Sequence, residues 1–212
     1  MTGSLSPRQQ ATAPIAAFTA AGRLPQLRAA LADGLQAGRT ISEIIEIQVQ
    51  MYAYAGFPRS LNGLGTFQAV LDERRAQGIT DEPGRPPTAL PAGTDILEVG
   101  TANQTRLAGA PVTGPLFAFA PAIDQFLKAH LFGDIFARDN LDWQNREIAT
   151  VAALATLDGL ESQLQSHLGI ALNTGLTETD LRNLVTVIRD RIGPDPADRA
   201  DAALGKALAN RT

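Results

Sequence analysis

The sequence predicts an all-α protein made of two tandem helical repeats packed with pseudo-twofold symmetry. Three observations support this prediction. The chain matches itself without gaps at an offset of 137 residues. Apolar residues recur at helical spacing in both copies, and glycine stops and threonine caps stand at equivalent positions. The 212-residue chain is 44% hydrophobic and 19% charged, as expected for a globular protein with a substantial core.

The internal match is strongest over residues 16–56 and places the two copies at about 8–78 and 145–212. Chance would give roughly three or four identities over this stretch in so alanine-rich a chain. More are found, and the chain is therefore interpreted as a tandem repeat. The identical pairs are Ala16/Ala153, Thr19/Thr156, Gly22/Gly159, Gln26/Gln163, Leu27/Leu164, Leu31/Leu168, Leu35/Leu172, Gly38/Gly175, Thr40/Thr177 and Gly56/Gly193.

Each copy is predicted to contain a helix that ends in a glycine. Leucines recur every four residues in 25–37 and in 161–174, which is the spacing of one apolar helix face. Gly38 and Gly175 follow these segments, where helices commonly end in a residue with positive φ. We therefore expect the same helix stop in both copies.

A second helix is predicted directly after each glycine stop. Thr40 and Glu43 have the spacing of a capping box, in which each side chain bonds the backbone of the other residue. Thr177 and Asp180 offer a less ideal version of the same arrangement. Both copies therefore encode a helix, a glycine stop, a threonine cap and a second helix.

Further helices are expected at both ends of each copy. Prolines near the first turn favour helices over 58–77 and 195–209. The segment 145–158 is nearly all apolar after its first residues, so it should be a buried helix. Its counterpart in the first copy, 8–21, contains Pro14, and we expect this proline to interrupt the helix.

The region between the copies is predicted to be mostly irregular. Residues 78–95 are rich in proline and glycine, which indicates a linker or surface loop. Residues 96–117 contain two weak strand-like fragments but too many Gly, Asn and Thr residues for a sheet. A helix is expected over 121–137, where large apolar residues recur at helical spacing.

Composition argues against several classes of function. The chain has no cysteine, which rules out disulfides, a cysteine nucleophile and a Cys-x-x-Cys redox centre. Its net charge of −4 argues against a nucleic-acid partner, which usually needs clustered Lys and Arg. No apolar run is long enough to cross a bilayer, and residues 1–10 lack the pattern of a signal peptide. We therefore expect a cytoplasmic protein with no membrane partner.

Several motifs resemble the carboxymuconolactone decarboxylase family. The run 141–147, the Ala/Leu-rich helix after it, His167 and the run 171–177 resemble the core of this family. Residues 54–62, beginning Tyr-Ala-Gly-Phe-Pro, resemble its C-terminal signature, and 126–142 resembles the segment before the core helices. The resemblance covers most of the chain apart from 79–110.

This resemblance implies a division of the chain into three parts. The first family-like repeat would occupy 1–78, followed by a Pro/Gly-rich linker over 79–110. The second repeat would occupy 111–212. Because family members assemble from single repeats, the resemblance also implies a homo-oligomer of this double-repeat chain, with a trimer favoured and a dimer next.

Two chemistries occur in this family. One branch resembles γ-carboxymuconolactone decarboxylase, a cofactor-free enzyme of aromatic catabolism, and the other resembles alkylhydroperoxidase D, which uses a Cys-x-x-Cys-x-x-x-His motif. Aligning that motif on His167 puts its two cysteine positions at Leu160 and Gln163. Without thiols, peroxide reduction has no nucleophile. The decarboxylase branch is the better match, and a peroxidase label would follow from the family name alone.

His167, Glu147 and Arg146 are the predicted catalytic residues. The resemblance makes His167 the acid/base histidine, which could protonate the carbanion left by decarboxylation. Glu147 could orient this histidine or relay a proton, and Arg146 could bind a substrate carboxylate. Structural roles remain open: a buried, hydrogen-bonded histidine, and a Glu and an Arg that simply stabilise a helix start.

Tyr52, Tyr54, Arg59 and Trp143 are the predicted substrate-binding residues. The segment from Tyr52 to Arg59 could close the site, and Trp143 could line it. Tyrosines two residues apart on a helix point in different directions, so at most one should face a given pocket. Core packing for the tyrosines and Trp143, and a solvated charge for Arg59, are the alternatives.

The family motifs are divided between the two copies. The histidine occurs only in the second copy, since Ala30 stands at the position equivalent to His167. The aromatic segment occurs only in the first copy, since 54–58 corresponds to 191–195, Arg-Ile-Gly-Pro-Asp. One composite site built from both copies fits this pattern, and so do two degenerate sites.

The remaining polar residues give no further site. We explain Glu43 by the helix cap and Glu46 by a solvent-facing position. His130 is interpreted as a packing residue. Two histidines far apart in sequence, without a His-Glu-x-x-His pattern, argue against a metal site.

The resulting hypothesis is a cofactor-free small-molecule lyase that uses acid/base chemistry on an anionic lactone or a related carboxylate. The alternative is a non-catalytic helical protein that binds a small anion or only forms an oligomer, because a fold alone does not transfer activity. An apolar pocket holding His167 would favour the enzyme.

Overall fold

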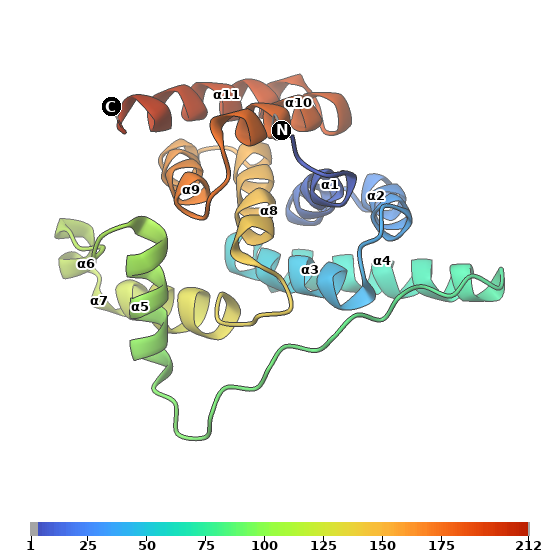
Figure 1. Cartoon of the computed structure of the whole chain (residues 1–212), viewed down its shortest axis with the longest axis horizontal. Helices are drawn as coiled ribbons and strands as arrows, with labels where there is room; N and C mark the ends of the chain where they lie inside the picture. Colours follow the sequence, from blue (N-terminus) through green and yellow to red (C-terminus); the bar gives the residue numbers. More distant parts are fainter. Residues whose placement is uncertain (1–3, 212) are drawn as a thin grey trace.

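The computed structural model describes residues 4–211, and all regular structure within them is helical (Figure 1). No helix in this part of the chain is both long and apolar enough to span a bilayer. The elements in chain order are α1 (Pro7–Ala21), α2 (Leu24–Gln36), α3 (Ile41–Ala55), α4 (Phe57–Ala76), α5 (Ile96–Ala108), α6 (Pro115–Phe119), α7 (Pro121–Phe126), the π-helix η1 (Leu127–Ile135), α8 (Trp143–Thr156), α9 (Glu161–Asn173), α10 (Glu178–Arg191) and α11 (Pro194–Ala209).

The predicted tandem repeat is confirmed helix by helix. Helices α2, α3 and α4 begin at residues 24, 41 and 57, and α9, α10 and α11 begin 137 residues later, at 161, 178 and 194. Thr40 and Thr177 both form complete capping boxes. Gly38 and Gly175 have φ of 89° and 98°, a conformation that other residues adopt only with strain. Local signals therefore act alike in both copies.

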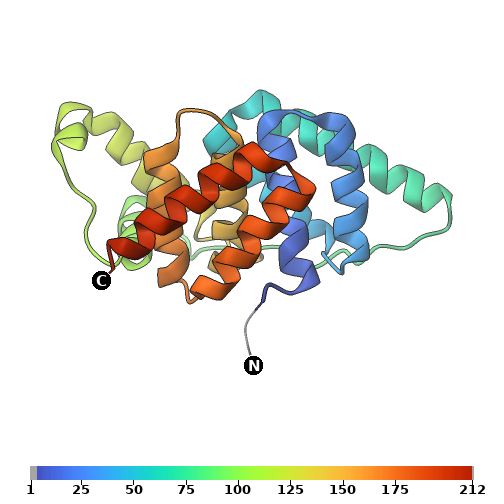
Figure 2. The same cartoon turned by 90° about the horizontal axis from the view of Figure 1, so that it is seen from above.

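The two copies pack around a central pair of helices, α1 and α8. Helix α8 also contacts α3 of the first copy, and α1 makes the reciprocal contact with α10 of the second copy. This exchange of equivalent contacts is the expected pseudo-twofold arrangement. Helix α8 is buried from Asn145 to Ala155, as predicted, and α10 and α11 pack over α8, α9 and α1 (Figure 2).

The expected interruption of the first helix at Pro14 is wrong. Helix α1 runs unbroken from Pro7 to Ala21 with Pro14 in its interior. A proline removes one backbone hydrogen bond and crowds the preceding turn. Residues Ala11 to Ala20 are all buried, so packing against α2, α3 and α8 offsets this cost.

Residues 96–108 form helix α5 and contain none of the strand-like structure that the sequence suggested. The Asp95 side chain caps the helix by accepting hydrogen bonds from two backbone N–H groups. Gly100 lies so close to the backbone of η1 that a Cβ there would collide with the carbonyl oxygen of Lys128, and Gly133 makes the reciprocal close approach to Ile96. Gly100, one of the residues that argued against a sheet here, and Gly133 therefore allow α5 and η1 to pack closely. The helix expected over 121–137 is found as α7 and η1.

Residues 79–95 have no regular structure and run as an extended segment from the end of α4 to α5 (Figure 1). The segment is held on the surface by hydrogen bonds of residues between 82 and 88. Backbone N–H groups of Ile41 and Ser42 donate to its carbonyls, and Asp139 accepts bonds from the backbone and side chain of Thr88. These bonds to Asp139 and the nearby Arg85 guanidinium hold the pKa of its carboxyl below the usual range.

The expected solvent position of Glu46 is wrong. Its side chain is fully buried between the copies, where it accepts a hydrogen bond from Arg146 at 2.8 Å and from Arg138 at 2.9 Å. Helix α3 packs this face against α8, so the residue is covered by a part of the chain a hundred residues away. Glu43 does cap α3, as predicted.

Candidate functional site

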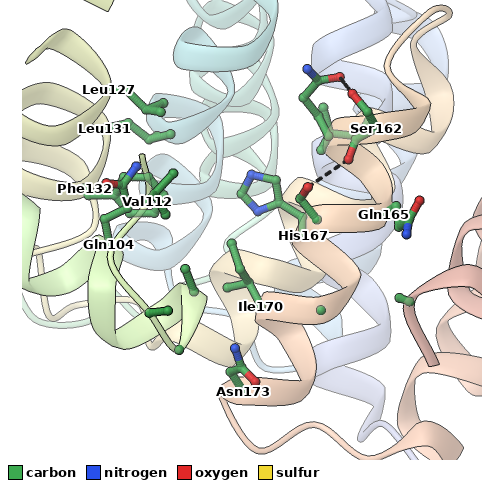
Figure 3. Close-up of a pocket in the computed structure, with 18 of the residues that line it drawn as sticks. Gln104, Val112, Leu127, Leu131, Phe132, Ser162, Gln165, His167, Ile170 and Asn173 are labelled. Atoms are coloured by element: carbon green, nitrogen blue, oxygen red, sulfur yellow. Dashed lines mark hydrogen bonds between the residues drawn. The ribbon is translucent and has the colours of Figure 1, made fainter. Parts of the chain in front are cut away.

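A partly open pocket of about 1130 Å³ lies between α9 and the wall formed by α5 and η1. Figure 3 shows side chains of both walls pointing toward one another, with the ring of His167 projecting from α9 into the space. Most of the lining is apolar or neutral. The lining residues include Tyr54 of α3, Gln104 of α5, Leu116 and Phe117 of α6, Leu127, Leu131 and Phe132 of η1, Gln163, Ser166, His167, Ile170 and Asn173 of α9, and Arg211.

His167 and Glu147 form a buried hydrogen-bonded pair at the pocket. The Nδ1 atom of His167 lies 2.8 Å from Oε2 of Glu147, which is completely buried. Helices α8 and α9 are joined by a tight turn at Gly159 and pack on each other, which brings the start of α8 beside the middle of α9. Among the described residues, Nε2 of His167 has no hydrogen-bond partner. The carboxylate thus orients the ring and leaves Nε2 available to a bound molecule.

Tyr54 brings the first copy into this site. Its ring lies edge-on to the ring of His167, with the centroids 5.8 Å apart. Its hydroxyl accepts a hydrogen bond from Thr150. Burial, and to a lesser degree the charge of Glu147, raise the pKa of Tyr54, so that its hydroxyl stays neutral in ordinary buffers. The pocket thus combines an aromatic residue of one copy with the histidine of the other.

Arg146 does not line the pocket. Its guanidinium is fully buried and donates to Glu46, to Gln50 and to the carbonyl of Arg138. Successive residues on a helix are about 100° apart, so Arg146 points to the boundary between the copies while Glu147 points toward α9. Burial lowers the pKa of Arg146, and Glu46 opposes this effect. The structure places Arg146 in the core between the copies, outside the pocket that His167 lines.

Tyr52 also lies outside this pocket. Its hydroxyl is 2.7 Å from Nε2 of His130, whose Nδ1 is 2.6 Å from Asp134. Its ring stacks on Phe57 with the centroids 4.0 Å apart. As predicted for tyrosines two residues apart, Tyr52 and Tyr54 serve different surroundings. His130, interpreted as a packing residue, is a partly exposed member of a hydrogen-bonded chain.

Arg59 and Trp143 make other contacts. Arg59 donates to the carbonyl of Ala21 and lines a smaller depression between the copies. Trp143 donates from its indole nitrogen to the carbonyl of Phe136, and the guanidinium of Arg106 lies over its ring. Neither side chain lines the pocket with His167. Of the seven predicted site residues, the structure brings together His167, Glu147 and Tyr54.

Sequence reasoning missed most of the pocket wall. Gln163, Ser166 and Ile170 share one helical face with His167, and this spacing could have identified them. Gln104 and Phe132 come from segments whose sequence carries no comparable signal, because their position depends on the close crossing of α5 and η1.

The cysteine positions of the redox branch are occupied by residues without a thiol. Gln163 lines the pocket, and Leu160 is a partly buried residue that packs against the core of the second copy. Over residues 4–211 no three His, Cys, Asp or Glu side chains gather into a group that could hold a metal ion. The polar groups at this site are imidazole, carboxylate, amide, hydroxyl and guanidinium groups.

Comparison with known families agrees with the fold and the motifs. The model of the Carboxymuconolactone decarboxylase family matches residues 1–69 and 121–205. The unmatched stretch between them contains the end of α4, the extended segment, α5 and α6. No curated protein matches the sequence. The matched segments cover well over half of the sequence, and the chain therefore belongs to the carboxymuconolactone decarboxylase family.

Proposed function

We propose that the protein is a cofactor-free lyase that removes carbon dioxide from an anionic lactone or a related small carboxylate. The observation that carries this proposal is the His167–Glu147 pair, with Nε2 of the histidine open to a largely apolar pocket. Perturbed or paired titratable groups in such a pocket are typical of acid/base sites.

The proposed reaction needs one proton donor. Cleavage of the carbon–carbon bond releases carbon dioxide and leaves its electron pair on the carbon of the substrate. The imidazolium form of His167 then donates its Nε2 proton to that carbon and becomes neutral, and a proton from water restores it. Glu147, 2.8 Å from Nδ1, holds the ring so that Nε2 stays directed at the pocket during this transfer.

Tyr54 and the apolar wall would shape the space in which this proton transfer occurs. The neutral Tyr54 ring against His167 limits the movement of the imidazole. Leu131 and Phe132 of η1 face α9 across the partly open pocket and would reduce the access of water to the reacting carbon (Figure 3). Exclusion of water protects a carbanion from uncontrolled protonation and strengthens the electrostatic interactions with His167.

The test of this proposal is the release of carbon dioxide from γ-carboxymuconolactone and from other carboxylated lactones. The His167→Gln variant should lose turnover by about two to four orders of magnitude, because a glutamine can pack but cannot transfer a proton. His130→Gln is the matched control, since His130 is the other histidine and lies outside the pocket.

Unchanged turnover in His167→Gln would contradict the assignment. Binding of these lactones by the wild-type protein without any release of carbon dioxide would instead identify a non-catalytic protein that binds small anions. The Glu147→Gln variant tests the role of Glu147 apart from that of His167, because it keeps a hydrogen-bond acceptor beside Nδ1 but removes the negative charge.

We also propose that the chain forms a homo-oligomer, with a trimer as the first state to test. The apolar faces of helices α3 and α8 are largely buried within the chain. Helices α6 and α7 instead bury no residue and expose Leu116, Phe119, Ile123 and Phe126. Helices this short gain little stability alone. Light scattering that gives the mass of one chain would contradict this proposal.

A further inference from the structure

The charge of the pocket points to the part of a substrate that it would bind. Arg211 is the one residue with a permanent charge among those that line the described pocket, and no carboxylate lines it. The other polar contributions come from neutral residues such as Gln104, Gln163 and Asn173, together with His167. Among the lining residues, an anion entering this space would therefore meet one cation and no carboxylate.

Hydrogen bonds hold the side chain of Arg211 against α9, the helix that carries His167. Its Nη1 atom donates to the side-chain oxygen of Asn173 at 2.7 Å and to the carbonyl of Gly169 at 3.3 Å. Both acceptors are neutral, and among the described residues Arg211 makes no ion pair. Residues 167 and 173 are separated by roughly 9 Å along the axis of α9. One small molecule in the pocket could therefore contact both the guanidinium of Arg211 and the imidazole of His167.

The other copy shows what an arginine at this position binds. Arg74 is equivalent to Arg211, because the two are 137 residues apart and lie at the same distance from the starts of α4 and α11. The guanidinium of Arg74 binds Asp81 through two hydrogen bonds, from Nε at 2.8 Å and from Nη2 at 2.6 Å. This fork is the preferred geometry for a carboxylate.

We propose that Arg211 binds a carboxylate that the substrate keeps during the reaction, in the way that Arg74 binds Asp81. The proposal rests on the proposed function for its reaction, and it adds the residue that holds the retained carboxylate while the other carboxyl group is lost near His167. Arg211 takes the anchoring role that sequence reasoning gave to Arg146.

The test uses trans,trans-muconate, a six-carbon dicarboxylate, and its neutral dimethyl ester as probes of the full chain. Isothermal titration calorimetry gives the affinities, and the NMR signals of the His167 ring report whether the probe occupies the pocket. In Arg211→Gln the affinity for muconate should fall about 10- to 100-fold, and the affinity for the dimethyl ester should stay the same. Arg211→Lys should keep part of the affinity, because it retains the charge but loses the fork.

Arg189→Gln is the matched control. Arg189 is an exposed arginine of α10 that pairs with Asp198 and does not line the pocket. Its loss should leave the affinity for muconate unchanged. Because Arg211 is exposed, its substitution should also leave thermal unfolding unchanged.

Three results would overturn the proposal: no binding of muconate by the wild-type chain, an affinity in Arg211→Gln within twofold of the wild type, or an equal loss in Arg189→Gln. The experiments also distinguish a failure of the lyase mechanism at His167 from a failure of the carboxylate anchor at Arg211. Turnover that survives in His167→Gln removes the lyase mechanism but leaves an affinity effect at Arg211 intact, whereas normal binding by Arg211→Gln removes only the anchor.

Discussion

The two copies of the repeat have the same helices but different polar residues. The pocket contains His167, Glu147 and Tyr54. The positions related to them by the 137-residue offset hold Ala30, Gln10 and Arg191. The caps and glycine stops are kept in both copies, and the proposed chemistry is kept in one pocket. The comparison shows that the fold depends on repeated local signals, whereas the site depends on residues that the repeat does not share.

The boundary between the copies is asymmetric in the same way. The buried pair of Glu46 and Arg146 joins α3 to α8. The equivalent positions in the opposite pairing, Asn183 and Gln9, hold neutral amides. A charged connection therefore exists on the side of the boundary next to Tyr54, and it holds α3 in the position from which Tyr54 reaches His167.

The largest expected effect comes from breaking this connection. Arg146→Met should destabilise the fold by about 3 kcal/mol, because it leaves Glu46 buried with fewer partners. The double variant Glu46→Gln/Arg146→Met should recover part of this loss, since it removes both charges. Urea unfolding of the single and double variants measures the effect. If Arg146→Met kept normal stability but lost muconate binding, Arg146 would be the residue that binds the substrate carboxylate.

The helices could be predicted from the sequence because their signals are local. Thr40 and Thr177 bond residues three positions away, and Gly38 and Gly175 act within one turn. The pairing of Glu147 with His167 could also be anticipated, because a short hairpin brings α8 beside α9.

The remaining features depend on contacts between distant segments. The burial of Glu46 requires α8 and the segment around residue 138 to cover it, and the position of Gln104 requires α5 to cross η1 at Gly100. Arg146 and Glu147 are adjacent in sequence yet face different neighbours. Neither periodicity nor the family resemblance indicates which of two adjacent side chains faces a pocket.

An intermediate effect is expected from the two caps, and here the copies should behave alike. Thr40→Ala and Thr177→Ala should each cost about 1 kcal/mol, because each removes a side chain that accepts a hydrogen bond from the third residue of its helix. Urea unfolding of both variants measures the costs. A difference well above 1 kcal/mol between them would show that the copies do not contribute equally to folding.

The smallest effect at neutral pH is expected for Tyr54→Phe. The variant removes one hydroxyl from the first copy's contribution to the site. Thr150, which donates to this hydroxyl, lies 3.0 Å from the carbonyl of Arg146 and can donate there instead. At pH 7 the variant should therefore unfold within about 1 kcal/mol of the wild type.

The same variant should gain relative stability in alkaline solution. Burial raises the pKa of Tyr54 in the folded state, whereas in the unfolded chain the hydroxyl ionises with a pKa of about 10. Below that pH both states keep the proton, and above it only the unfolded state releases it, so the wild type loses stability as the pH rises. At pH 11 this loss is about 1.4 kcal/mol, and Tyr54→Phe should not show it. Urea unfolding from pH 7 to pH 11 measures the difference, with Tyr52→Phe as the control that keeps Tyr54 and its alkaline loss. Parallel pH profiles for the wild type and Tyr54→Phe would mean that the hydroxyl of Tyr54 reaches solvent, and the site would then be more open than the edge-on contact with His167 indicates.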